Sequence, residues 1–221
     1  NFYQKDDNEK TKIKNKLRIN KDDFVILNIG AMTENKGIDI LLVAFFLLRK
    51  KYKNIKLILK DQSNLFKVYA SQYIKQMKNS KYSNLLDEKF VRDIILISEN
   101  LTVSSVNDLY NIADCYVSPY RAEGFNMTPL EAAACGTPII VTKGGSTDDY
   151  FKNYLGLQIE SKINKIKNKT MLEPNLDSLM SNISEIYYKK FILDKKKYIE
   201  NINLNYNWSK IATNLIDIFN K

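Results

Sequence analysis

Short apolar segments alternate with helical segments along most of this 221-residue chain. The helical patterns cover 38–51, most of 61–92, 106–113 and 128–135. The apolar runs cover 24–30, 55–59, 94–97, 115–118, 138–142 and, more weakly, 155–159. The first run is almost uninterrupted and ends in Gly, which is typical of a parallel strand covered on both faces. The alternation therefore predicts an α/β fold, a doubly wound parallel sheet of the Rossmann type with helices on both faces.

The chain divides into a polar start and one folded domain. Residues 1–23 are charged, show only a weak helical pattern, and are expected to be a linker or connecting segment. Residues 24–221 are expected to form one nucleotide-binding domain with extra C-terminal helices, since the helical pattern runs from Asn175 to the end and Trp208 opens the last helix. The chain starts with Asn1 rather than Met, so we expect a fragment or a processed form.

Lysine supplies nearly all of the formal net charge of +9 and gathers at 50–51, 162–169 and 189–197. Such clusters can mark a surface for nucleic acid or for an anionic membrane. No nucleic-acid motif accompanies them, so we interpret them as solvated faces and expect no nucleic-acid partner, while peripheral membrane contact stays open. The longest apolar stretch, 38–48, is too short to span a bilayer.

Two cysteines, Cys115 and Cys135, each lie in an apolar element and form no Cys-x-x-Cys motif. They are expected to be buried, reduced thiols, which indicates a reducing compartment such as the cytoplasm. The chain contains no histidine, so a mechanism that needs a His base must obtain it from elsewhere.

One stretch, 120–138, combines a glycine-containing loop with the start of a helix and carries two carboxylates, Glu123 and Glu131. Thr128 can serve as the N-cap, Pro129 suits the first helical position, and Glu131 would complete a capping box. Such a helix start offers unpaired N–H groups and a positive dipole end to an anion. Glu123, on the loop, is expected to reach a neutral polar group such as a sugar hydroxyl.

This stretch resembles the Glu-x7-Glu signature of retaining glycosyltransferases with the two-Rossmann-domain GT-B fold, especially the group 1 family, also called family 4. Glu-Gly-Phe at 123–125, Pro-Leu-Glu-Ala at 129–132 and Cys-Gly-Thr-Pro at 135–138 agree with the family pattern. The resemblance runs from about residue 24 to the C-terminus and implies the donor-binding C-terminal domain of such an enzyme. The acceptor-binding N-terminal Rossmann domain would then be absent from this chain.

The resemblance implies a role for each matching residue. Glu123 would contact the donor sugar, Glu131 the ribose, and Lys36 the diphosphate. The remaining residues would surround the donor through backbone N–H groups, close backbone approach or contacts to the nucleobase; they are Gly30, Phe125, Asn126, Met127, Thr128, Gly144, Gly145, Leu101 and Val103.

Two departures from the family pattern alter the expected pocket. Ala31 stands where the family usually has a second diphosphate-binding cation, an Arg, so Lys60, Lys143 or a residue of the missing domain would have to replace it. After the strand that ends at Leu59, the family often has a Gly-x-Gly turn, whereas this chain has Lys-Asp-Gln.

The expected activity is retaining glycosyl transfer from a UDP-, GDP- or ADP-sugar to an acceptor glycan, protein or lipid. No Asp-x-Asp motif and no cluster with metal-ligand spacing occurs, so we expect neither a metal nor another cofactor. Two alternatives stay open. The chain could be a non-catalytic nucleotide-sugar-binding module, or it could belong to another GT-B-fold enzyme, such as an epimerase or a phosphorylase relative.

Overall fold

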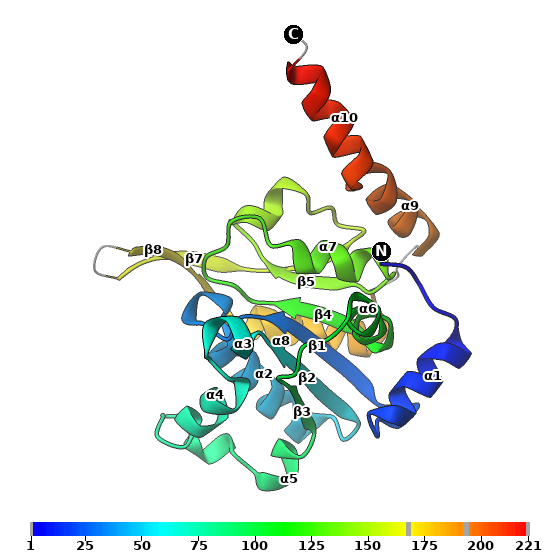
Figure 1. The fold of residues 1–221 in the computed structure, drawn as a ribbon. Coiled ribbons are helices and arrows are strands. Elements are labelled where there is room, and N and C mark those ends of the chain that lie inside the picture. Colours follow the sequence, from blue (N-terminus) through cyan, green and yellow to red (C-terminus); the bar gives the residue numbers. More distant parts are fainter. Residues whose placement is uncertain (1, 167–168, 192–194, 220–221) are drawn as a thin grey trace.

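Six parallel strands form the centre of the molecule. The computed structural model describes residues 2–166, 169–191 and 195–219. In chain order the strands are β1 (Phe24–Gly30), β2 (Ile55–Asp61), β3 (Ile94–Ile97), β4 (Cys115–Ser118), β5 (Ile139–Thr142) and β6 (Gly156–Ile159). They lie in the order β3-β2-β1-β4-β5-β6 (Figure 1). The direction of strand addition reverses between β1 and β4, and ligands of doubly wound sheets bind at the carboxyl ends of the strands at such a point.

Helices cover both faces of the sheet (Figure 1). One core is shared with α2 (Ile38–Lys51), α4 (Ala70–Met77) and α8 (Leu176–Tyr187). The other is shared with α1 (Asp7–Lys16), α6 (Val103–Ile112), α7 (Met127–Ala134) and α9 (Lys195–Asn205). The predicted doubly wound α/β fold is therefore confirmed.

Strand β1 serves both cores because successive side chains of a strand point to opposite faces. Ile26 lies in the core under α2, while Val25 and Leu27 lie in the core under α6 and α7. All seven residues of β1 are buried, as its uninterrupted apolar run predicts. The carboxyl end of β1, Gly30, is thus held at the middle of one edge of the sheet.

The region 61–92 differs from the single mostly helical stretch that its sequence suggests. Strand β2 continues to Asp61, and short helical segments follow: α3 (Ser63–Phe66), α4, the 3-10 turn η2 (Ser83–Leu85) and α5 (Glu88–Val91). The buried Asp61 carboxylate accepts hydrogen bonds from the Ser63 N–H, the Ala70 N–H and the Ser98 hydroxyl, at 3.2, 3.1 and 2.7 Å. A carboxylate with three donors thus holds the turn where the family pattern has Gly-x-Gly.

An antiparallel hairpin, β7 (Ser161–Ile166) and β8 (Lys169–Pro174), was not predicted from the sequence. Its strands alternate only weakly between polar and apolar residues, so the pattern gives little signal. Two further 3-10 turns lie at the carboxyl edge of the sheet, η1 (Glu34–Lys36) after β1 and η3 (Ser146–Asp149) after β5.

The segment before β1 packs against the domain. Helix α1 has a capping box formed by Asp6 and Glu9 and lies beside α6. The Tyr3 N–H donates to Asn107 Oδ1 at 2.9 Å, and the Lys5 N–H donates to Asn111 Oδ1 at 2.7 Å. Tyr3 and Lys5 are therefore tied to α6 by hydrogen bonds from their N–H groups to asparagine side chains, and α1 packs on the same helix.

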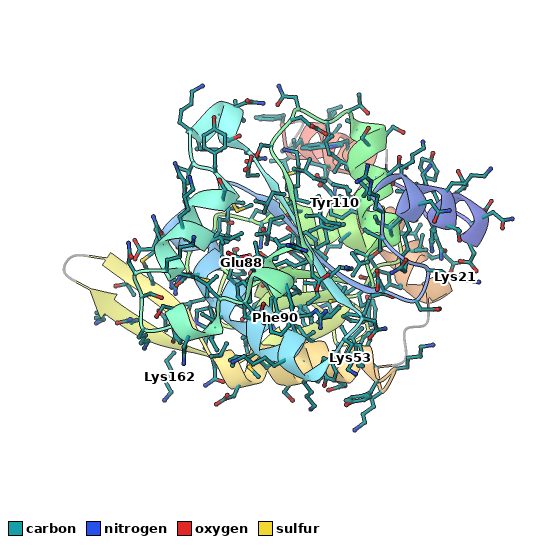
Figure 2. The ribbon with its side chains drawn as sticks, turned by 90° about the horizontal axis from the view of Figure 1, so that it is seen from below. Lys21, Lys53, Glu88, Phe90, Tyr110 and Lys162 are labelled. Carbon is teal, nitrogen blue, oxygen red and sulfur yellow. The ribbon has the colours of Figure 1, made fainter. Side chains whose placement is uncertain are left out.

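The last helix, α10 (Trp208–Phe219), opens with Trp208 as predicted and projects away from the sheet (Figure 1). Among the described residues, no helix combines the length and the apolar character needed to cross a membrane. Of the basic side chains, Lys21, Lys53 and Lys162 lie at well-separated places and point outward, whereas Tyr110 lies inside (Figure 2).

Candidate functional site

The loops that leave β1 and β4 meet at the carboxyl edge of the sheet and bring Lys36 and Glu123 together as an ion pair. Their side chains are 22% and 13% exposed. The lysine side chain folds back over the end of β1, since a Cβ built on Gly30 would lie 3.7 Å from Lys36 Cε and 3.8 Å from its Nζ. Two residues 87 positions apart, both predicted to act on the donor, therefore face each other at the point where the strand order reverses.

Close backbone contact fixes this meeting of the loops. Gly37 has φ of +66°, a left-handed conformation that favours glycine. A Cβ built on Gly37 would lie 2.0 Å from the carbonyl oxygen of Pro119, the residue that follows β4 by one position. A side chain at this position would therefore push the two loops apart and separate Lys36 from Glu123.

The predicted capping box between Thr128 and Glu131 is wrong. Helix α7 starts at Met127, and its N-cap is Asn126, with φ of +62° and no side-chain hydrogen bond to the first turn. The Thr128 hydroxyl is engaged elsewhere, because its Oγ1 lies 2.7 Å from the hydroxyl of the buried Tyr116 on β4. The start of α7 therefore has no side-chain cap, and its first N–H groups remain suited to an anion.

Asn126 has a structural role besides its place at the helix start. Its Nδ2 donates to Ser118 Oγ at 3.0 Å, and its carbonyl oxygen accepts from the Tyr150 hydroxyl at 2.8 Å. These bonds tie the unusual backbone conformation of Asn126 to β4 and to the segment after η3. The orientation of the helix start thus follows from contacts that sequence spacing does not reveal.

Glu131 lies on α7, and its Oε2 accepts a hydrogen bond of 2.7 Å from the hydroxyl of Tyr110 on α6. Burial raises the pKa of Glu131, and the bond from Tyr110 opposes that shift. Burial also raises the pKa of Tyr110 well above its usual value, so Tyr110 acts as the donor. The bond occupies one carboxylate oxygen and fixes the orientation of the group.

Exposed apolar side chains flank the loop after Glu123. Phe125 and Met127 are 45% and 50% exposed, and the Phe125 ring centroid lies 5.3 Å from that of Tyr150. A Cβ built on Gly124 would meet no atom within 4 Å. The loop therefore has open space at Gly124, the residue that follows Glu123.

At the turn after β5, side chains of the protein bond to the backbone and fill the space beside the two glycines, Gly144 and Gly145. The Gly144 N–H donates to Asp148 Oδ2 at 2.8 Å. A Cβ built on Gly145 would lie 2.7 Å from the Tyr120 hydroxyl oxygen, so Gly145 gives space to Tyr120. Packing thus explains Gly145, whereas Gly144 has φ of +91°, a backbone conformation that favours glycine.

Leu101 and Val103 lie at the start of α6, on the same edge of the sheet. Thr102 caps this helix by accepting the Ser105 N–H at 3.1 Å. Leu101 is partly buried, and Val103 is 54% exposed. Helix α6 begins three residues earlier than the predicted 106–113, because Thr102 supplies an N-cap upstream of the apolar pattern.

No free cation replaces the family's Arg among the residues proposed from the sequence. Ala31 is buried, and the Lys60 ammonium donates to the Asp61 carbonyl oxygen. Burial lowers the pKa of Lys60. Lys143, which is exposed, pairs with Glu160 at 2.9 Å. Among Lys36, Lys60 and Lys143, only Lys36 forms an ion pair with Glu123.

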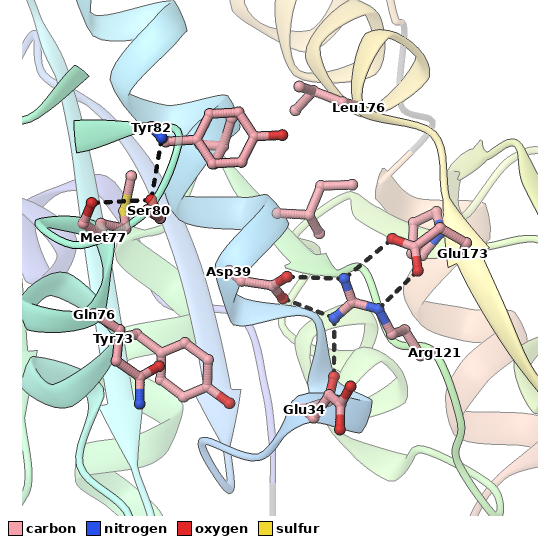
Figure 3. Close-up of a pocket in the computed structure, with 13 residues that line it drawn as sticks. Glu34, Asp39, Tyr73, Gln76, Met77, Ser80, Tyr82, Arg121, Glu173 and Leu176 are labelled. Carbon is pink, nitrogen blue, oxygen red and sulfur yellow. Dashed lines mark hydrogen bonds and ion pairs between the residues drawn. The ribbon is translucent and has the colours of Figure 1, made fainter. Parts of the chain in front are cut away.

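Two cavities of about 600 and 630 Å³ lie elsewhere, and neither is lined by Lys36, Glu123 or Glu131. The first lies between α2, α4 and the end of β8, and Figure 3 shows it with Arg121 at one end. In the part of the chain that the structure describes, no group of three His, Cys, Asp or Glu side chains is placed to hold a metal ion.

Comparison with known proteins gives the family. The model of the family described as "Glycosyl transferases group 1" matches residues 9–186. The lipopolysaccharide 1,2-N-acetylglucosaminetransferase of Salmonella typhimurium is 26% identical over 211 residues, which make up 93% of this chain and 50% of that protein. The chain spans half or less of the length of the first curated relatives that it matches.

Solved structures show the same fold. Sucrose-phosphate synthase from Thermosynechococcus elongatus superimposes with a TM-score of 0.74 at 19% identity, over 99% of this chain and 49% of that one. HepE of Anabaena, solved in complex with UDP and glucose, has a TM-score of 0.74 at 14% identity, over 99% of this chain and 54% of that one. The chain therefore belongs to the glycosyl transferases group 1 family and has the fold of the C-terminal domain of a GT-B glycosyltransferase.

Proposed function

We propose that this chain is the donor-binding domain of a retaining, metal-independent glycosyltransferase and binds a nucleotide-diphosphate sugar, a UDP-, GDP- or ADP-sugar. The observation that carries the proposal is the ion pair between Lys36 and Glu123, set at the point of strand reversal beside the uncapped start of α7. The UDP and glucose bound by HepE, which shares the fold, support a donor of this class.

The ion pair suggests how a donor would be received. A diphosphate would take the place of the Glu123 carboxylate as the partner of Lys36, because an anion of higher charge attracts the ammonium more strongly. Glu123 would then be free to accept a hydrogen bond from a hydroxyl of the sugar. Lys36 and the N–H groups at the start of α7 would stabilise the charge that grows on the leaving diphosphate.

Glu131 would bind the ribose in this arrangement. Its Oε2 is held by Tyr110, which orients the carboxylate and leaves Oε1 for a ribose hydroxyl. Leu101 and Val103 would face the nucleobase from the start of α6, and the backbone of Phe125, Met127 and Thr128 would line the sugar and phosphates.

Transfer with retention does not require a histidine from this chain. The acceptor hydroxyl oxygen would bond to the anomeric carbon on the face from which the diphosphate leaves. The bond between that carbon and the phosphate oxygen breaks, and the leaving oxygen takes the acceptor proton. The acceptor, a glycan, a protein or a lipid, would bind to an N-terminal Rossmann domain outside these 221 residues. Two buried free thiols, Cys115 and Cys135, support a cytoplasmic location.

A second candidate is a binding module without transferase activity. Ala31 is buried at the position where the family usually has its second phosphate-binding cation, and this observation favours the alternative. Both candidates require donor binding, whereas only the first requires transfer when an acceptor domain is present.

The test is binding of UDP, GDP, ADP and their common sugar conjugates, measured by thermal shift and by calorimetry. We expect one nucleotide to stabilise the wild-type chain and to bind about tenfold more weakly to Lys36→Ala, since a hydrogen bond to a charged group is lost. Lys53→Ala is the matched control, because Lys53 is exposed and lies in the turn between α2 and β2, at the amino edge of the sheet. Absence of binding by every nucleotide, or equal binding by Lys36→Ala, would overturn the proposal.

A further inference from the structure

Arg121, two residues before Glu123, uses all five N–H groups of its guanidinium within the protein (Figure 3). Nε and Nη2 donate to Glu173 at 3.2 and 3.1 Å, and Nη1 and Nη2 donate to Asp39 at 2.7 and 2.8 Å. Nη1 also donates to the carbonyl oxygen of Glu34 at 3.0 Å. A guanidinium has five such donors and no acceptor, so its hydrogen-bonding capacity is fully used.

This arrangement separates Arg121 from the missing diphosphate cation. Its side chain is only 10% exposed, and the Asp39 and Glu173 carboxylates raise the pKa of Arg121 above its usual value. A phosphate could bind to Arg121 only by displacing one of these carboxylates or the Glu34 carbonyl. Arg121 therefore does not replace the Arg that is absent at Ala31.

The backbone of Arg121 and Ala122 makes further hydrogen bonds, which join three segments. The Arg121 and Ala122 N–H groups both donate to the Asn35 carbonyl oxygen, at 2.6 and 3.3 Å, and Asn35 Nδ2 donates to the Ala122 carbonyl oxygen at 3.1 Å. On the other side, the Leu172 N–H on β8 donates to the Arg121 carbonyl oxygen at 2.9 Å. The loop after β4 is thus bonded to the loop after β1 and to the hairpin.

We propose that Arg121 is a positioning residue: together with Asp39 on α2 and Glu173 on β8, it forms a clamp that holds Glu123 against Lys36. The contacts that carry this lie two positions before each member of the ion pair, at Arg121 and at Glu34. A Cβ built on Gly124 would meet no atom within 4 Å, so the clamp and the bonds between Asn35 and Ala122 are the attachments that lead up to Glu123. The hairpin, through Glu173, then takes part in donor binding without touching the donor.

The clamp itself is tested by hydrogen exchange of the free protein, which does not depend on the proposed function. We compare Arg121→Lys, which keeps the charge but loses the fork, with Glu173→Gln, which keeps Arg121 and removes one acceptor. The Ala122 and Leu172 amides, which donate to the Asn35 and Arg121 carbonyl oxygens, should exchange about tenfold faster in both variants, since a charged hydrogen bond is lost in each. Glu88→Gln, at an exposed glutamate of α5, is the matched control and should exchange like the wild type.

Unchanged exchange of the Ala122 and Leu172 amides in both Arg121→Lys and Glu173→Gln would overturn the clamp. Faster exchange throughout the sheet would also contradict it, because that result means a general loss of stability and not a local one. Exchange in β1 and β4 therefore serves as an internal reference for each variant.

The consequence for binding rests on the proposed function and is measured as the ratio of the Kd of the free nucleotide to that of its sugar conjugate. Both variants should lower this ratio, because Glu123 contacts the sugar and free nucleotide does not reach it. If Arg121 contacted the diphosphate instead, Arg121→Lys would weaken both ligands equally and Glu173→Gln would leave them unchanged or tighter, which would overturn the clamp. If the wild type binds no nucleotide, the proposed function fails, while the exchange experiment still decides the clamp.

Discussion

Two ion-pair sites stand at opposite edges of the same sheet. At the amino edge, Asp93 accepts from Arg49 Nε at 2.6 Å and also pairs with Lys56. At the carboxyl edge, Glu123 pairs with Lys36. The side chains of both sites are buried to a similar degree, between 11% and 22% exposed. Burial alone therefore does not distinguish them.

Their surroundings do distinguish them. Asp93 has two cations from two elements, and Arg49 also donates to the Tyr52 carbonyl oxygen at 3.3 Å and lies 5.0 Å from the centroid of the Phe90 ring. For Glu123, Lys36 is the only partner found in the described part of the chain, and open space adjoins it at Gly124. The first site is built into the fold, whereas at the second we propose that a ligand replaces the carboxylate as the partner of Lys36.

The largest effect should follow from breaking the amino-edge site. Asp93→Ala leaves Arg49 and Lys56 mostly buried without their carboxylate, and we expect a loss of about 3 kcal/mol in the free energy of unfolding. Urea denaturation measures it. If Asp93→Ala lowered the free energy of unfolding no more than Glu123→Ala does, the proposed difference between the two sites would be contradicted.

A smaller effect is expected at Asp61, which lies at the carboxyl edge but is fully embedded. Its three hydrogen bonds lower its pKa against the opposing effect of burial. The folded protein thus favours the carboxylate, so this contribution is complete above the unfolded pKa of 3.8 and is lost as the pH falls through the lower folded value.

Asp61→Asn should lose about 2 kcal/mol near neutral pH, since an amide cannot accept from all three donors. The variant should also lose the part of the acid sensitivity below pH 3.8 that Asp61 causes. Unfolding measured between neutral pH and strong acid tests both results. If the free energy of unfolding of Asp61→Asn fell as steeply below pH 3.8 as that of the wild type, Asp61 would not titrate as described.

Glu123→Ala should change the stability by less than about 1 kcal/mol, because the Lys36 ammonium can turn toward the adjacent open space and be solvated. The same variant should weaken binding of the sugar conjugate but not of the free nucleotide. Calorimetry with both ligands, beside urea denaturation, measures the contrast. Large destabilisation would make this ion pair a structural one, like that of Asp93.

The sequence predicts the helices and strands better than the side-chain contacts between them. The ends of β1, α2 and β4 were predicted to the residue, because apolar runs and helical periodicity mark them locally. The bond from Tyr116 that overrides the Thr128 cap links β4 to α7, and the Tyr110 partner of Glu131 lies 21 positions away. Such pairings depend on tertiary packing, which a local pattern cannot reveal.

Part of the geometry of the candidate site follows from the sequence for the same reason, while the roles of its residues stay predictions. The spacing of Glu123 and Glu131 and the position of Lys36 follow a family pattern, and their places at the carboxyl edge follow from parallel topology. The network around Arg121 involves Glu173 on a hairpin that has no clear sequence signal. Its contribution could be read only from the folded chain.

The smallest effect is expected from metal removal. Donor binding should be unchanged by EDTA, since Lys36 and the start of α7 would supply the positive charge that a metal would otherwise bring. Titration of the donor with and without chelator tests this prediction. Weaker binding in EDTA that magnesium restores would contradict metal-independent donor binding.

The most direct test is a crystal structure of the chain with the nucleotide sugar that binds best. The account predicts that the ion pair opens, with Lys36 Nζ on a diphosphate oxygen, Glu123 on a sugar hydroxyl, and the Asp93 site unchanged. A donor bound elsewhere, or bound here with Lys36 still paired to Glu123, would contradict it.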